Sequence, residues 1–354
     1  MISKVIIVTG FYPPNIGGLE KQLQSWASLL GDKGVEVIVH TNALFAPEGT
    51  TQESAHVSVI RACSDLSTWS LAAADWVRRH ATKESVVVVA SLGSDTSLGM
   101  LQCLTYAHQR GARVIMNVPT SDHLERAAAH KGALDFLRDV DRYVTVSPRS
   151  ADKLRQQRVD VIYLPNYLPE REIISPKAKL PNRRSVAYFG RISARKRVDL
   201  LPKVATLLPS GIEMIVQGPP GFGEQQLYER LSHELADAGV KVLPGNSTPA
   251  PEVAKSIVFI NPSEAEGCSI ALLEAMNRGS IPVVSDLPEN DSVLNGLGYL
   301  CTDDPQVYAD SIVAAIEDPK RAGVQRSLRY CVASSYSQTA LAGALYAALL
   351  KGWQ

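Results

Sequence analysis

Short apolar runs alternate with amphipathic stretches along most of this chain. The runs are rich in Val and Ile and are expected to be strands at 5–9, 35–41, 57–61, 86–91, 114–118 and 143–147. Stretches with apolar residues at helical spacing lie between several of them, at 19–30, 70–80 and 98–110. Nearly continuous apolar runs are typical of strands buried on both faces, so the pattern predicts a parallel sheet with helices on either side.

The same pattern resumes after a proline-rich stretch at 165–185, which shows no helical periodicity. Strands are expected at 186–190, 212–217, 240–243, 257–261 and 282–285, with helices from about 199, at 225–238, at 271–278 and on to the end. Two successive α/β units predict two Rossmann-like, doubly wound domains that face each other across a cleft. We expect domains at 1–167 and 186–335, a linker at 168–185, and a last helix at 336–354 that packs back on the first domain.

Charge and cysteine content exclude several classes of protein. Lys+Arg and Asp+Glu are both 36, and this balance argues against a protein that binds nucleic acid through its backbone. The Val-rich run 86–90, like every other apolar run of the chain, is far shorter than the roughly 20 residues that span a bilayer. The five cysteines are widely spread, with no paired spacing for a structural zinc site. We therefore expect a soluble protein of the cytoplasm.

The segment 261–276, with the sequence NPSEAEGCSIALLEAM, is the strongest candidate for a ligand site. A buried strand ends here, a polar loop with Glu266 and Gly267 follows, and a helix begins. A helix start of this kind attracts phosphate through its free N–H groups. Those groups belong to Cys268, Ser269 and Ile270. Glu274 lies eight residues after Glu266, and we expect the two carboxylates to contact separate parts of an elongated ligand. Two solvated acids at a helix start are the alternative.

Several motifs in a fixed order resemble those of the retaining glycosyltransferases of family 4, which have the GT-B fold. The E-x7-E pair lies within P-S-x-x-E-G and L-E-A-M and is followed by G-x-x-P-V-V. Residues 10–20 resemble the glycine loop of that family, and residues 189–196 resemble its G-R-x-x-x-x-K segment. Residues 141–147 and 164–166 resemble the end of its first domain.

The resemblance implies a role for each candidate residue. Arg191 and Lys196 would neutralise the diphosphate leaving group, a task that a guanidinium and an ammonium perform well. Glu266 would hold hydroxyls of the donor sugar, and Glu274 would hold the ribose. The base would lie near backbone at Gly218, Leu243 and Asn246, while Gly17 and Gly18 would approach the phosphate and the reacting sugar. In the first domain, a side chain near the reacting sugar is expected from His123, with Asp122 and Ser121 as alternatives.

Three departures from the family pattern leave the donor sugar open. Cys268 and Ser269 replace the usual aromatic residue and glycine, Arg197 replaces a common glycine, and Tyr167 follows Asn166 where a glycine is usual. Asp139 and Asp141 have the D-x-D form of metal-dependent enzymes of another fold, but we interpret them as part of a surface turn. We interpret Glu20 as an acid in the first turn of a helix, His40 as an ordinary strand-end residue, and Arg195 and Arg197 as a solvated basic loop.

The resemblance implies that the chain transfers a sugar with retention, without a metal or a cofactor. The donor would be a nucleotide-diphosphate sugar, linked to UDP or GDP, and the acceptor a small molecule, a lipid-linked saccharide or a glycan. A sugar-nucleotide epimerase, a glycan phosphorylase and a non-catalytic nucleotide-sugar-binding protein remain as alternatives. A weak contact with the inner face of a membrane, through 78–80 and 131–138, is the alternative to solvated helix faces there.

Overall fold

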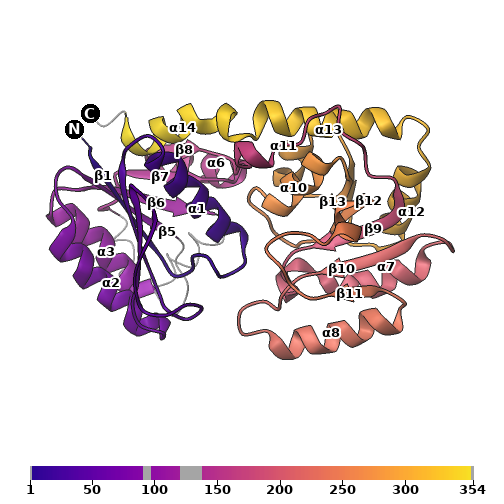
Figure 1. Ribbon diagram of the computed structural model, residues 1–354, viewed down its shortest axis with the longest axis horizontal. Coiled ribbons are helices and arrows are strands. Elements are labelled where there is room, and N and C mark those ends of the chain that lie inside the picture. Colours follow the sequence, from indigo (N-terminus) through magenta and orange to yellow (C-terminus); the bar gives the residue numbers. More distant parts are fainter. Residues whose placement is uncertain (1, 91–96, 120–137, 352–354) are drawn as a thin grey trace. The chain divides into compact units, whose positions relative to one another are not determined.

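The computed structural model describes residues 2–90, 97–119 and 138–351. The chain divides into two compact units, which we call unit 1 (Met1–Pro165 with Leu341–Gln354) and unit 2 (Asn166–Ala340). Each unit contains a largely parallel sheet with helices beside it (Figure 1). The predicted mixed α/β fold with parallel sheets is confirmed. Within the described part of the chain, no helix combines the length and the apolarity that a membrane crossing requires.

Unit 1 has a sheet of eight described strands in the order β3-β4-β2-β1-β5-β6-β7-β8. The strands are β1 (Lys4–Thr9), β2 (Glu36–Thr41), β3 (Gly49–Ser54), β4 (Val57–Arg61), β5 (Ser85–Ala90), β6 (Arg113–Val118), β7 (Arg142–Thr145) and β8 (Val161–Tyr163). The helices described here are α1 (Gly18–Gly31), α2 (Leu66–His80), α3 (Ser97–Gln109), α6 (Pro148–Gln156) and, from Leu341 onward, α14 (Gln338–Leu350).

The core of unit 1 explains its near-continuous Val and Ile runs. Alternate residues of β1, Ile6 and Val8, join one buried cluster with Trp69 of α2 and Leu104 of α3. The intervening residues of β1 are also fully buried. Figure 1 shows α2 and α3 together along one side of this sheet. Both faces of the strands therefore lose contact with water, which is the condition that continuous apolar strands satisfy.

The end of α14 is held in unit 1 by a buried arginine. Arg142 of β7 donates through Nη1 to the carbonyl oxygens of Ala348 (3.0 Å) and Lys351 (2.9 Å) in the last turn. Its Nε lies 2.7 Å from the Asp160 carboxylate. Tyr346 of α14 also donates to the Leu29 carbonyl of α1 at 3.0 Å. Carbonyls at a helix C-terminus lack partners within the helix, so a cation is favourable at this position.

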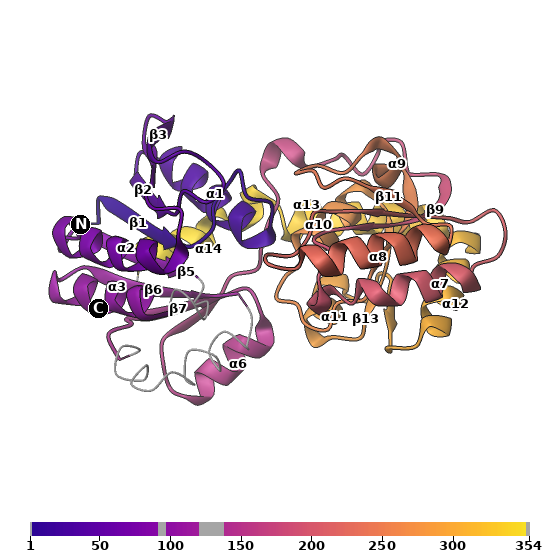
Figure 2. The ribbon, with the colours of Figure 1, turned by 90° about the horizontal axis from the view of Figure 1, so that it is seen from below.

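Unit 2 has a sheet of six described strands in the order β11-β10-β9-β12-β13-β14, all parallel. The strands are β9 (Arg183–Phe189), β10 (Glu213–Gln217), β11 (Lys241–Leu243), β12 (Ser256–Asn261), β13 (Ile281–Ser285) and β14 (Tyr299–Cys301). The helices are α7 (Leu201–Leu207), α8 (Gln225–Asp237), α9 (Pro251–Ala254), α10 (Ile270–Arg278), α11 (Pro288–Leu294), α12 (Pro305–Glu317) and α13 (Arg321–Ser335). Figure 2 shows α7 and α8 side by side on one face of unit 2.

The strand order places a topological switch point in each sheet. In unit 2 the chain leaves β9 toward β10 on one side, and later returns to β12 on the other side of β9. In unit 1 the equivalent pair is β1 and β5. In doubly wound sheets, ligands bind beyond the carboxyl ends of the strands at this point, because the two loops diverge there.

Several elements were not expected from the sequence, and three of them lie in unit 1. The antiparallel strand β3 is exposed along its whole length and pairs with β4 at the sheet edge, so it lacks the apolar residues that reveal a strand. Helix α6 follows β7 and begins with Ser147, whose side chain accepts from the Ser150 N–H. The short strand β8 is only partly buried at the other edge. Each is a polar or marginal element whose position depends on its neighbours.

Candidate active site

The switch point of unit 2 brings together two loops that carry the strongest sequence candidates. The loop after β9 contains Arg191 and Lys196, and the loop after β12 contains Glu266. A backbone hydrogen bond from the Glu264 N–H to the Arg195 carbonyl, 3.0 Å long, joins the two loops. The two loops are about 70 residues apart in the sequence, as Lys196 and Glu266 show, and they lie close together because β9 pairs in parallel with β12.

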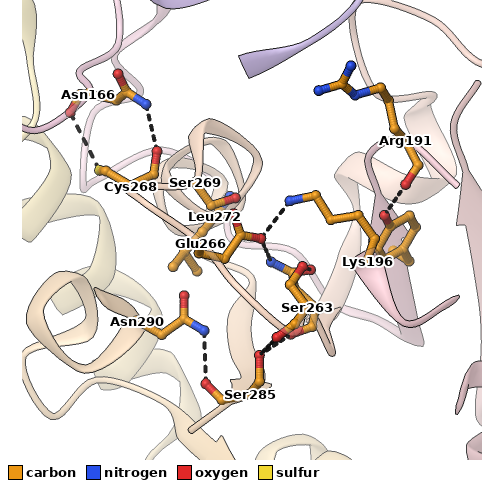
Figure 3. A network of polar contacts seen from close by, with 12 residues as sticks. Asn166, Arg191, Lys196, Ser263, Glu266, Cys268, Ser269, Leu272, Ser285 and Asn290 are labelled. Atoms are coloured by element: carbon orange, nitrogen blue, oxygen red, sulfur yellow. Dashed lines mark hydrogen bonds and ion pairs between the residues drawn. The ribbon is translucent and has the colours of Figure 1, made fainter. Parts of the chain in front are cut away.

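Lys196 and Glu266 form an ion pair at the centre of this site (Figure 3). Lys196 Nζ lies 2.6 Å from Glu266 Oε1. The same oxygen accepts a hydrogen bond from Asn261 Nδ2 at 2.8 Å. The Lys196 side chain is 25% exposed, whereas that of Glu266 is 8% exposed. The ammonium therefore retains access to solvent while the carboxylate is nearly enclosed.

The environment of Glu266 keeps its carboxylate ionised. Burial by itself would raise the pKa, because a charge loses its hydration. The positive charge of Lys196 and hydrogen bonds from Lys196, Asn261 and Ser263 outweigh burial, so the pKa lies below its ordinary value. A buried carboxylate that stays charged is suited to stabilise positive charge on a ligand.

The start of α10 offers unengaged backbone donors next to this pair. Ser269 caps the helix by accepting from the Leu272 N–H at 3.4 Å. Among the described residues, no acceptor is found for the N–H groups of Cys268, Ser269 and Ile270. The loop is also held from the other side, because Asn166 Nδ2 donates to the Cys268 carbonyl at 2.6 Å (Figure 3). The sequence prediction of free donors at residues 268–270 agrees with this geometry.

Arg191 lies on the same loop as Lys196, but among the described residues its side chain forms no ion pair like that of Lys196 with Glu266. The buried Tyr188 hydroxyl donates to the Arg191 carbonyl at 2.5 Å, which holds the backbone at the start of the loop. In the part of the chain that is described, the guanidinium of Arg191 has no hydrogen-bond or ion-pair partner. Figure 3 draws it without any of the dashed contacts that surround Glu266. Arg191 is thus available to bind an anion.

Glu274 lies inside α10 and is buried, with 4% of its surface exposed. Its Oε2 lies 3.8 Å from Nη1 of Arg278, one turn further along the helix. Burial lowers the pKa of Arg278, and the negative charges of Glu274 and Glu172 act in the opposite direction. Glu274 is therefore not a solvated acid at a helix start, which was the alternative explanation for it.

The segments that were expected near a base lie next to each other. Gly218 follows β10, and a Cβ on it would be 1.7 Å from the Gly190 carbonyl oxygen. Leu243 ends β11, and a Cβ on the nearby Gly245 would lie 2.5 Å from the Pro219 nitrogen. Asn246 is exposed in the loop that contains Gly245. The first close approach joins the loops after β9 and β10, and the second joins the loops after β10 and β11.

The candidate residues of unit 1 are described only in part, and those at the start of α1 surround a buried carboxylate. Gly17 precedes α1, and a Cβ on it would lie 2.2 Å from Glu20 Oε2, so the glycine makes room for that carboxylate. Gly18, the first residue of α1, has nothing within 4 Å of such a Cβ. Glu20 does lie in the first turn, as expected, but it is buried and accepts from Asn15 Nδ2 at 2.5 Å. His123, Asp122 and Ser121 lie outside the described residues.

Other sequence interpretations can be compared with the contacts. Thr105 donates to Asp139 at 2.6 Å, and Asp141 accepts from the Val114 N–H at 2.7 Å, so both acids brace the start of β7. His40 is buried, and its Nδ1 accepts from Trp69 Nε1 at 3.2 Å. The interpretation of Arg197 as part of a solvated basic loop is wrong. Its Nη1 lies 2.9 Å from Asp303 Oδ2 and forms an ion pair with it.

Sequence reasoning missed two residues of the site, Asn261 and Ser263. Asn261 ends the buried strand β12 and contacts Glu266 directly. Ser263 is fully buried and donates to Asn261 Oδ1 at 2.6 Å. Polar side chains at the end of an otherwise apolar strand are the signal that could have identified them, since such groups are rarely buried without partners.

Comparisons with known proteins indicate the family to which this chain is similar. Residues 183–318, most of unit 2, match the family model "Glycosyl transferases group 1". The chain is 26% identical over 344 residues to one of the subunits of phosphatidylinositol N-acetylglucosaminyltransferase from Arabidopsis thaliana. That alignment covers 89% of this chain and 73% of the plant protein.

Two solved structures share the fold over nearly the whole chain. HepE of Anabaena, in complex with UDP-glucose, has a TM-score of 0.74 at 16% identity and covers 97% of this chain and 98% of its own. Sucrose-phosphate synthase from Thermosynechococcus elongatus has a TM-score of 0.76 at 16% identity, with the same coverage. These likenesses show the GT-B fold, and the family-model match supports a glycosyltransferase.

Proposed function

We propose that this chain is a retaining glycosyltransferase of family 4 that transfers a sugar from a nucleotide-diphosphate sugar to an acceptor hydroxyl without a metal ion. The observation that carries the proposal is the pairing of Lys196 with Glu266 at 2.6 Å, beside the unengaged N–H groups at the start of α10. This arrangement offers positive charge for a diphosphate and a negative charge for the sugar within one small site. The E-x7-E spacing places a second carboxylate, that of Glu274, on α10, whose start forms part of this site.

The donor diphosphate would bind Lys196, Arg191 and the N–H groups of residues 268–270. Each of these is a strong donor to phosphate oxygens, and the helix dipole adds to their attraction. Glu274 would accept from the ribose hydroxyls, and the base would lie beside the loops at 218 and 243–246. These positions follow the carboxyl edge of the unit 2 sheet from β12 to β11.

The chemistry needs charge stabilisation more than proton transfer by the protein. The bond between the anomeric carbon and the phosphate oxygen breaks, and negative charge grows on the diphosphate next to Lys196 and Arg191. The acceptor oxygen bonds to the same face of the anomeric carbon, and its proton passes to the departing phosphate oxygen. The Glu266 carboxylate offsets positive charge on the sugar as the bond breaks. The two cations supply the charge that a metal ion supplies in other enzymes.

We propose a UDP-linked donor first and a GDP-linked donor second. HepE, which shares the fold, was solved with UDP-glucose. The acceptor is one of three classes, a small molecule, a lipid-linked saccharide or a glycan. The name of the Arabidopsis relative motivates the inclusion of a phosphatidylinositol acceptor in the lipid class.

A thermal-shift screen against UDP-, GDP-, ADP- and dTDP-linked sugars identifies the donor without knowledge of the acceptor. A ligand at about 100 times its Kd stabilises the folded protein by about 2.7 kcal/mol, enough to raise Tm measurably. We expect one nucleotide class to stabilise the wild type, and the shift to be lost in Lys196→Ala. No shift with any of the four classes would contradict the proposal.

Transfer assays with the identified donor then test the reaction. NMR of the product should show the anomeric configuration of the donor retained, with and without EDTA present. An inverted product or a loss of activity in EDTA would contradict the retaining, metal-independent reaction. An isomerised donor without acceptor would indicate an epimerase, and donor binding with no turnover across all acceptor classes would indicate a binding protein.

A further inference from the structure

A chain of three buried side chains ends on Glu266. Ser263 Oγ donates to Asn261 Oδ1 at 2.6 Å, and Asn261 Nδ2 donates to Glu266 Oε1 at 2.8 Å. Asn261 is 3% exposed and Ser263 is fully buried. Two different groups, one charged and one neutral, therefore act on the same oxygen.

The orientation of the Asn261 amide is determined by its surroundings. An amide can rotate by half a turn and exchange its oxygen for its nitrogen. Here the ionised Glu266 carboxylate can only accept, so Nδ2 faces Glu266, and the Ser263 hydroxyl holds this orientation by donating to Asn261 Oδ1. The backbone under Ser263 is held as well, because Ser285 Oγ donates to the Ser263 carbonyl at 2.5 Å. A preset donor of this kind needs no rearrangement when a ligand arrives.

Once the sugar-nucleotide donor is bound, Lys196 would contact its diphosphate as well as Glu266, so the ion pair alone would no longer hold the carboxylate in place. In the proposed function the same ammonium binds the diphosphate, which carries more negative charge than one carboxylate. Lys196 is the more exposed partner of the pair and has a flexible side chain. When Lys196 turns toward phosphate, the 2.8 Å hydrogen bond from Asn261 Nδ2 still holds Glu266 Oε1.

We infer that Asn261, with its amide oriented by Ser263, is a positioning residue that holds the Glu266 carboxylate in place while Lys196 engages the donor diphosphate. This inference rests on the proposed function for the role of Lys196. It assigns Asn261 no contact with the substrate. Its effect on the reaction passes through Glu266.

The inference predicts a specific change in pH dependence. Lys196 on the β9 loop acts on Glu266 through its charge, and the titratable groups Tyr188 of β9 and Cys268 before α10 lie close enough to feel the Glu266 charge. Burial raises the pKa of the Tyr188 hydroxyl and the Cys268 thiol, so both are neutral near pH 7. The acidic limb of activity then reports Glu266, whose pKa rises when a hydrogen bond to its charged form is lost.

The experiment compares Asn261→Leu with Asn290→Leu. Asn290 is also a buried asparagine, but it donates to the Ser285 carbonyl at 2.8 Å and does not contact Glu266. We expect the acidic limb of kcat to move up by about one pH unit in Asn261→Leu, and to stay in place in Asn290→Leu. Ser263→Ala removes the hydrogen bond that holds Asn261 Oδ1 and should move the limb in the same direction by about half a unit. The Ser263→Ala variant also tests the inference if Asn261→Leu fails to fold.

A second measurement is independent of turnover. Carbon-13 NMR of glutamate-labelled protein follows the Glu266 carboxyl directly, with the signal assigned by its loss in Glu266→Gln. We expect its titration to shift upward in Asn261→Leu and not in Asn290→Leu. Equal titrations in the two variants would overturn the inference. A wild type that binds and transfers no sugar would refute the proposed function instead, while the NMR comparison would still test the hydrogen bond to Glu266.

Discussion

The carboxyl edges of the two sheets have similar topology but different chemistry. In unit 2 the loops after β9 and β12 carry a charged pair, Lys196 and Glu266, supported by buried amide and hydroxyl groups. In the described part of unit 1, two buried contacts near the ends of β2 and β6 join neutral groups: His40 accepts from an indole, and Asn117 donates to Gln22 at 3.2 Å. The described residues thus differ in these buried contacts, with an ion pair in unit 2 and neutral hydrogen bonds in unit 1.

The largest effect should come from removing charge at the unit 2 edge. We expect Lys196→Ala and Glu274→Ala each to lower turnover by roughly 10²–10³, because each removes a preorganised contact. Steady-state kinetics with the identified donor measures the loss, and circular dichroism checks the fold. Arg230→Ala is the matched control, since Arg230 pairs with Glu234 on the exposed surface of α8. If both site variants keep normal turnover, the assignment of the site is wrong.

Alanine substitutions at two glycines should differ in their cost to stability, because one glycine lies against backbone and the other has open space around it. A Cβ on Gly218 would lie 1.7 Å from the Gly190 carbonyl, so Gly218→Ala should cost about 3 kcal/mol of stability. Gly18 in unit 1 has nothing within 4 Å, so Gly18→Ala should change stability by less than about 0.5 kcal/mol. Denaturant unfolding measures both. A loss of activity in Gly18→Ala without a loss of stability would identify close ligand approach at this position.

The pH dependence of stability should differ between the two edges. Burial, with a smaller contribution from His80, lowers the pKa of His40 from 6.5 to about 4. Below pH 6.5 the unfolded chain binds a proton at this residue that the folded protein does not, so stability falls between about pH 6.5 and 4. The contribution of the Glu266 pKa is lost only further down, as the pH falls through its lowered value.

His40→Asn isolates the first of these effects, because the Asn oxygen can still accept from Trp69. Between pH 6.5 and 4, we expect the wild type to lose up to about 3 kcal/mol more stability than this variant. Urea unfolding at a series of pH values measures the difference. Parallel curves for the two proteins would show that His40 is not held neutral.

The smallest effect concerns Arg197, next to Lys196. Arg197 has φ 50° and ψ 37°, a left-handed conformation that favours glycine, and its side chain pairs with Asp303 and Asp199. Arg197→Ala keeps the strain and loses the ion pairs, whereas Arg197→Gly relieves the strain. We therefore expect the glycine variant to be more stable than the alanine variant by about 1 kcal/mol. Thermal unfolding of the pair tests this, and equal stabilities would show that the conformation is not strained.

The two units also differ in how much of each was readable in the sequence. Most strands of both sheets were predicted because their apolar runs are local signals, and Lys196 and Glu266 were chosen as candidates because each follows such a run. The exposed strand β3 was missed because its residues carry no apolar pattern, and it pairs only with the sheet edge. Elements with their own hydrophobic face were thus predictable, and elements that depend on a neighbour were not.

The sequence by itself determined the two α/β units and the residues that we propose for diphosphate binding, since these depend on residue type and short-range spacing. Only the tertiary structure decided that Asn261 and Ser263 support Glu266, and that Arg197 reaches Asp303. It also decided that Gly218 is required by the Gly190 backbone. Asn261, Ser263 and Glu266 lie in one loop whose conformation the surrounding strands set, whereas the contacts of Arg197 and Gly218 join segments that strand order and register bring together. Hydrogen bonds and van der Waals contacts act over a few ångströms, so residue spacing along one segment cannot specify which atoms of another segment lie within that range.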